Sequence, residues 1–139
     1  MKKFSRGRTL AVVAVAAGAV LASVAPVMAD VSTQSPSAGI KVEPIAKIQA
    51  AGAAVEIKVT YTCPAGFSSY VFLDVNQAVI GGVAKGADSA EVRCTGKPES
   101  VSLIPIAQDR PFRWGSAWVR ANLTSFPGTV DERTVTILP

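Results

Sequence analysis

The chain has 139 residues, a formal net charge of +4, two cysteines and no histidine. The whole positive excess lies at the N-terminus, in Lys2, Lys3, Arg6 and Arg8, and the rest of the chain has as many basic as acidic residues. This balance argues against a basic surface for nucleic acid or for an anionic membrane. The lack of histidine excludes an imidazole base and a Ser-His-Asp triad.

Residues 1–29 have the pattern of a cleaved signal peptide. A basic start is followed by an almost unbroken apolar run over residues 10–27 and by a cleavage pattern at Val27-Met28-Ala29. We therefore expect a secreted protein whose mature chain begins at Asp30 and does not associate with the membrane. The alternative is an uncleaved membrane anchor, because the apolar run is near the shortest length that spans a bilayer.

The mature chain is predicted to hold one domain. Residues 30–38 are polar and contain proline, which favours a short flexible lead-in. The remaining residues, 39–139, have the length of a single domain with its own core.

The clearest strand pattern covers residues 55–63. Apolar side chains alternate there with polar ones, which is typical of a half-buried strand. The same alternation recurs over 70–76 and 90–94. Cys63 and Cys94 both have the inward parity of their strands. Two cysteines in an exported chain favour one disulfide, which we expect to be buried between facing sheets.

Shorter strands complete the pattern. Residues 40–48 predict a first strand that Pro44 confines to a sheet edge. Gly81-Gly82 favours a hairpin turn or a bulge, and a break is expected at 86–88. Further strands are predicted near the C-terminal side, over 101–107, 117–123 and 134–137. Seven to eight short strands separated by turns favour an antiparallel immunoglobulin-like β-sandwich, with a closed barrel as the alternative.

Two segments resemble a known family. Tyr61-Thr62-Cys63-Pro64-Ala65-Gly66, with Cys94 closing a later strand, and the run Phe112-x-x-Gly115-x-Ala117-x-Val119-x-Ala121-x-Leu123 are similar to small secreted immunoglobulin-like domains of actinobacteria, a largely uncharacterised family. The resemblance covers residues 50–138. It implies the sandwich fold and brings no catalytic residues. Members of this family carry further cysteines near the last strands, which this chain lacks.

The carboxylates do not form a recognisable catalytic pattern, because they are scattered over turns and outward positions. We therefore expect a non-enzymatic protein without a cofactor, with a secreted hydrolase as an outside alternative. Asp109, Asp131 and Glu132 could supply oxygen ligands to calcium, but a solvated turn is the preferred interpretation, so no metal site is predicted.

Outward aromatic residues carry the functional prediction. Tyr70, Phe72 and Trp118 have outward parity, and neighbouring strands would gather them on one sheet face beside Arg120 and Asn122. Exposed aromatic residues beside arginine are typical of interfaces. We therefore expect this face to bind a protein or a cell-wall polymer. The alternative is a structural protein that self-associates through this face and has no ligand, so either a monomer or a weak homodimer is expected.

Overall fold

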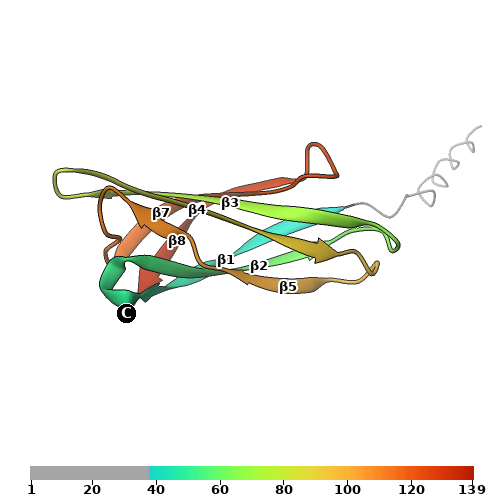
Figure 1. Cartoon of the computed structure of the whole chain (residues 1–139), viewed down its shortest axis with the longest axis horizontal. Helices are drawn as coiled ribbons and strands as arrows, with labels where there is room; N and C mark the ends of the chain where they lie inside the picture. The colour runs from blue at the N-terminus through green and yellow to red at the C-terminus, as the bar shows by residue number, and fades with distance from the viewer. Residues whose placement is uncertain (1–37) are drawn as a thin grey trace, which may run out of the picture. The chain divides into compact units, whose positions relative to one another are not determined.

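The computed structural model describes residues 38–139, which form an all-β domain (Figure 1). The predicted signal peptide, its cleavage site and residues 30–37 of the predicted lead-in lie outside the described residues. A short 3-10 turn, η3 (Ala50–Gly52), separates the first two of eight strands. The strands are β1 (Gly39–Gln49), β2 (Ala54–Thr62), β3 (Ser68–Val79), β4 (Gly82–Arg93), β5 (Glu99–Leu103), β6 (Ile106–Gln108), β7 (Gly115–Leu123) and β8 (Val130–Leu138).

The sheet closes on itself. Neighbouring strands follow the order β1-β8-β7-β3-β4-β6-β2, and β2 pairs back with β1 to complete a ring of seven strands. β5 pairs with β2 on the same edge as β6. All of the pairs are antiparallel except β1–β8, which is parallel. The domain is therefore a closed mixed barrel, and the predicted antiparallel immunoglobulin-like sandwich is wrong.

The first reason for closure is β1, which pairs on both of its edges. Its register with β2 shifts between Val42 and Ala46, while residues 45–47 pair with β8. Pro44 lies inside this irregularity, where a missing backbone N–H removes no ladder bond to β2. The prediction that the proline confines this strand to an edge is therefore wrong, because the bulge accommodates the proline within a strand that pairs on both of its edges.

The second reason is β6, which bridges β4 and β2. The predicted chain break at residues 86–88 is also wrong, since β4 continues through it from Gly82 to Arg93. Gly86 allows a close approach instead of a turn. A Cβ added there would lie 2.8 Å from the carbonyl oxygen of Ile106 and 3.0 Å from the ring of Phe112.

The inward faces of the strands were predicted correctly. Val71, Leu73 and Val75 of β3 are buried, as are the alternate residues of β2 and β7 that the pattern placed inward. Cys63 and Cys94 form the predicted disulfide and are buried. The disulfide joins the chain just after β2 to the chain just after β4, and these strands are not hydrogen-bonded neighbours in the barrel. Its expected position between two facing sheets is wrong, because all of the strands belong to one closed sheet.

The backbone pairing of β4 with β6 covers only Lys85–Ala87. Beyond this short ladder, side-chain hydrogen bonds link β4 to β5 and to the residue that follows β5. The Asp88 carboxylate accepts a 2.7 Å hydrogen bond from the backbone N–H of Ile104. The Tyr61 hydroxyl donates to Glu99 at 3.2 Å and to the carbonyl of Arg93 at 3.4 Å. Burial raises the pKa of Tyr61, and the hydrogen bond and negative charge of Glu99 raise this pKa further.

The two ends of the barrel carry different loops (Figure 1). One end holds the β3–β4 hairpin turn, the loop between β6 and β7, and η3. The other end holds the β2–β3, β4–β5 and β7–β8 connections, including the disulfide.

Candidate functional site

The predicted aromatic face is divided by the register of β3 and β7. Tyr70, Phe72 and Trp118 all point outward, and each is more than 40% exposed. However, Phe72 pairs with Asn122, and Trp118 pairs with Asn76, four residues farther along β3. From strand rise and strand spacing, the Cα atoms of Phe72 and Trp118 are about 14 Å apart. The structure thus brings Tyr70 and Phe72 together and leaves Trp118 separate.

The polar members of the predicted face lie between and beside the rings. Arg120 is opposite Asp74 on β3 and opposite Glu132 on β8, and it forms a 3.3 Å ion pair with Glu132. Both side chains of this pair are about half exposed, so it contributes little to stability. Asn122 is partly buried between Phe72 and Val130. The participation of these residues in binding remains a prediction.

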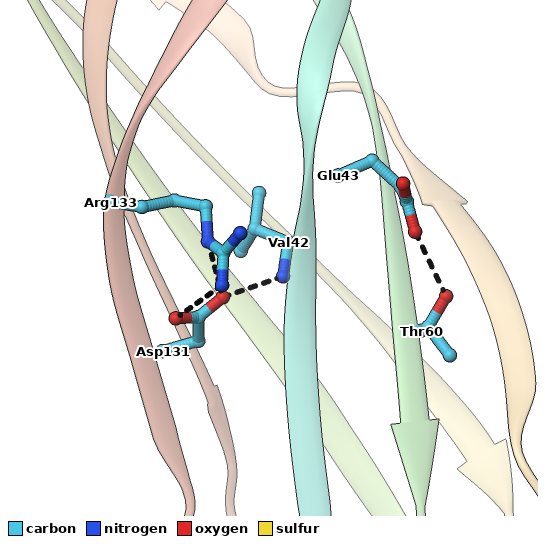
Figure 2. A network of polar contacts seen from close by, with 5 residues as sticks. All are labelled: Val42, Glu43, Thr60, Asp131 and Arg133. Carbon is cyan, nitrogen blue, oxygen red and sulfur yellow. Dashed lines mark hydrogen bonds and ion pairs between the residues drawn. The ribbon is translucent and has the colours of Figure 1, made fainter.

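Two of the three acidic residues considered for calcium, Asp131 and Glu132, form other contacts. Asp131 accepts two hydrogen bonds from Arg133, at 2.7 and 3.1 Å, and a third, at 2.7 Å, from the backbone N–H of Val42 (Figure 2). Nearby on β1, Glu43 accepts a 3.3 Å hydrogen bond from Thr60. Within residues 38–139 no group of three or more acidic, cysteine or histidine side chains could hold a metal ion.

The Asp131 contacts have a structural purpose. Its carboxylate joins β8 to β1 beside the bulge, where the backbone ladder is interrupted. Burial alone would raise the pKa of Asp131, but the hydrogen bonds from Arg133 and Val42 and the positive charges of Arg133 and Lys41 outweigh burial and lower this pKa.

The loop between β6 and β7 is anchored deeply at one barrel end. Phe112 is fully buried, and its backbone N–H donates a 2.9 Å hydrogen bond to Gly52 in η3. A Cβ on Gly52 would clash with the Phe112 carbonyl oxygen, so only glycine permits this approach. Phe112 thus fixes the loop against the core and against η3.

Gln77 of β3 holds the same loop from the other side. Its side chain is buried, donates a 2.7 Å hydrogen bond to the Arg113 carbonyl and accepts a 2.8 Å hydrogen bond from the Arg113 backbone N–H. Both polar groups of the amide are therefore satisfied by one residue of the loop. A buried glutamine with this geometry fixes the backbone at Arg113, and so the direction in which residue 114 leaves it.

Arg110 links the loop to the β3–β4 hairpin. Its guanidinium lies over the turn, because a Cβ added at Gly81 would be 3.1 Å from Nη1 and one added at Gly82 would be 2.8 Å from Nε. Both glycines have positive φ, as does Asp109. Neither Arg110 nor Arg113 forms an ion pair within the part of the chain that the structure describes.

Exposed side chains with little polar character stand on this anchored framework. Trp114 is 70% exposed and Ile80, in the hairpin turn, is 100% exposed. Three open hollows surround them, the largest about 520 Å³, and Arg113 lines all three. We call Ile80, Arg110, Arg113 and Trp114 the barrel-end surface.

A larger hollow of about 750 Å³ lies at the opposite end, beside the disulfide. Its exposed ring is Phe67, which packs edge-on against Phe126 at a centroid distance of 6.1 Å. Part of the Phe67 ring is therefore already covered by a contact within the domain, whereas Trp114 has no aromatic partner among the described residues. The barrel-end surface is the better candidate site.

Strand parity missed this surface because its residues lie in turns. The signals present in the sequence were the segment Arg110-Pro111-Phe112-Arg113-Trp114 and the hairpin turn Val79-Ile80-Gly81-Gly82-Val83, which lacks any polar side chain. Hairpin turns favour asparagine, aspartate and glycine. Isoleucine at position 80 is therefore unusual for a hairpin turn, and the stability of the turn does not explain it.

The described domain has further features that bear on its location. No helix within residues 38–139 has the length and apolar character needed to cross a membrane. The disulfide is consistent with an extracellular protein, because such bonds persist in oxidising compartments.

Comparison with known proteins adds little. No family model matches the chain. No curated protein matches it either. Among solved structures, the chain is similar to the alkylpurine DNA glycosylase AlkC of Pseudomonas fluorescens, bound to DNA containing an abasic site analog, with a TM-score of 0.43 and 14% sequence identity. The match covers 76% of this chain and 32% of the glycosylase chain, so the chain spans about a third of that protein. At this level, the similarity carries no inference about activity or ligand.

Proposed function

We propose that the protein is an extracellular, non-enzymatic binding module that attaches to another component of the cell envelope or medium without transforming it. The observation that carries this proposal is the anchoring of the loop that presents Trp114. Buried Phe112 and Gln77 hold this loop, and its exposed indole has no aromatic partner within the described domain. Rigid aromatic anchors bind well because little conformational freedom is lost on association.

The hydrogen bonds and the ion pair that several carboxylates form support the non-enzymatic part of the proposal. Asp88 and Asp131 accept backbone hydrogen bonds that join strands, and Glu99 accepts one from Tyr61. Glu132 pairs with Arg120. Groups committed in this way are poor general acids or bases, because catalysis would break contacts that stabilise the fold.

A capture experiment tests the proposal. Immobilised protein should retain a component of a cell-envelope extract, Trp114→Ala should lose this retention, and the variant should melt at the wild-type temperature because the ring is exposed. Trp118→Ala is the matched control, since it removes an indole from the aromatic face predicted from the sequence. Retention that is lost with Trp118→Ala and kept with Trp114→Ala would return the function to that face, and equal retention by all three proteins would refute specific binding. A protein or a wall-associated polymer, the partners expected from the sequence, both suit an exposed indole.

A second candidate is self-association through β3. Tyr70 and Phe72 are neighbours on its outward side, and both are close to half exposed. A homodimer through these rings should sediment as a monomer after Phe72→Ser. Sedimentation as a monomer at high concentration before substitution would eliminate this candidate.

A further inference from the structure

Besides Trp114, the barrel-end surface contains a projecting apolar turn and two arginines. Attachment through the indole alone would not need these additional groups. Ile80 is fully exposed at the tip of the β3–β4 hairpin, and the next apolar residue of β4, Val83, is 43% exposed. Figure 1 shows this hairpin turn as the outermost part of its barrel end. An aliphatic side chain at such a point gains free energy only if it enters an apolar medium or a matching pocket.

Cationic groups border this apolar turn. The Arg110 guanidinium lies over Gly81-Gly82, and Arg113 lies beside Trp114 along the same hollows. Within the loop and the hairpin turn, the two arginines outnumber the one acidic residue, Asp109, while Lys85 lies farther along β4 in a hollow that Asp74 also lines. The near-neutral composition of residues 30–139 therefore hides a local positive surface.

We propose that the barrel-end surface docks on an anionic lipid surface. In this arrangement Ile80 enters the boundary between headgroups and acyl chains, Trp114 lies at the interface, and Arg110 and Arg113 contact lipid phosphates. Indole rings favour this depth because one edge is apolar and the N–H remains hydrated. Arginine binds phosphate with a geometry suited to two hydrogen bonds.

Lipid fits these observations better than a protein or a polysaccharide does. Ile80 is fully exposed and projects from the surface, and it does not line the hollow that Trp114 shares with Phe112, so a partner that only filled this hollow would leave Ile80 in water. A polysaccharide would use the indole and the arginines, but it offers nothing to a fully exposed isoleucine. The rigid loop lets the apolar and cationic groups enter a lipid interface together, without first becoming ordered.

This inference rests on the proposed function, since both use the barrel-end surface, and vesicles provide the test. The chain has two tryptophans, so Trp118→Phe leaves Trp114 as the only indole. Its emission should shift to shorter wavelength with vesicles of phosphatidylglycerol and phosphatidylcholine, and less so with phosphatidylcholine alone. In the reciprocal variant, Trp114→Phe, the emission of Trp118 should not shift. Salt should weaken binding to the anionic vesicles.

Sedimentation with the same vesicles measures the individual contributions. Arg113→Gln should lower the partition coefficient about fivefold, and Ile80→Ser should lower it roughly tenfold or more. Arg93→Gln and Val130→Ser are matched controls, because both residues are exposed and belong to β4 and β8 near the opposite end of the barrel. These controls should bind vesicles like the wild type.

The outcomes separate the inference from the proposed function. No sedimentation with anionic vesicles, or equal loss in the control variants, overturns lipid docking. If capture from the envelope extract still depends on Trp114 while vesicles do not bind, the binding function stands with a protein or polymer as its partner. If neither vesicles nor extract bind, both proposals fail.

Discussion

Replacing Gln77 by methionine tests whether the barrel-end loop is held by the two hydrogen bonds to Arg113. Methionine has nearly the same length but neither donates nor accepts these bonds. Gln77 is 3% exposed, so its side chain lies in the interior of the barrel end. The Arg113 residue is exposed, so water can satisfy part of what its backbone loses. With about 1 kcal/mol for each bond, we expect a loss of roughly 2 kcal/mol in the free energy of unfolding.

Urea unfolding measures this loss, and hydrogen exchange locates it. The Arg113 amide, which donates to Gln77 at 2.8 Å, should lose most of its protection in Gln77→Met, whereas amides in β2 should keep theirs apart from the global change. The matched control is Gln108→Met, at an exposed glutamine of β6, which should change stability by less than about 0.5 kcal/mol. Equal destabilisation by both variants, or an unchanged Arg113 amide, would show that the two hydrogen bonds of Gln77 do not hold the loop.

The remaining predictions concern export, the disulfide and acid stability. Mass spectrometry of the secreted protein should give a chain that starts at Asp30, and recovery of an intact N-terminus would contradict the signal-peptide prediction. Replacing Cys63 and Cys94 by alanine should lower the free energy of unfolding by roughly 2–5 kcal/mol in denaturant titrations, and a smaller change would mean that strand pairing alone keeps the barrel closed at that end. Because the fold lowers the pKa of Asp131, its contribution to stability is present above the pKa of an unfolded aspartate, about 3.9. This contribution is lost as the pH falls through the lower folded pKa. Asp131→Asn should therefore reduce the free energy of unfolding at pH 7 by roughly 1–2 kcal/mol, and the stability of the variant should change less than that of the wild type as the pH is lowered. An unchanged acid titration in this variant would assign the effect to other carboxylates.

The sequence determined the faces of the strands. Alternation of apolar and polar side chains is a local property, and a strand keeps it whichever partner it has. The buried residues of β2, β3 and β7 were therefore predicted correctly, as was the outward direction of Tyr70, Phe72 and Trp118. The disulfide was also predictable, because strand parity and the predicted export of the chain favoured it without any knowledge of topology.

Strand partners and register were decided by the tertiary structure. Two packed sheets and one closed barrel present the same alternation along each strand, so the pattern cannot separate them. Closure depends on the bulge at residues 42–46, which lets β1 pair on both edges, and on the three residues of β6. Register likewise placed Asn76, rather than Phe72, beside Trp118. An offset of two or four residues between two strands moves a side chain by about 7 or 14 Å along its neighbour without changing its face.

The barrel-end surface is the feature most dependent on tertiary structure. The sequence places Ile80 in a turn and Trp114 in a loop, where periodicity carries no information about exposure. Burial of Phe112, the two hydrogen bonds from Gln77 and the close approach at Gly52 orient that loop. Each of these contacts joins residues more than 30 positions apart in the chain. Local pattern therefore determined which side chains are apolar and which way each strand faces, whereas long-range contacts determined which exposed groups share one surface.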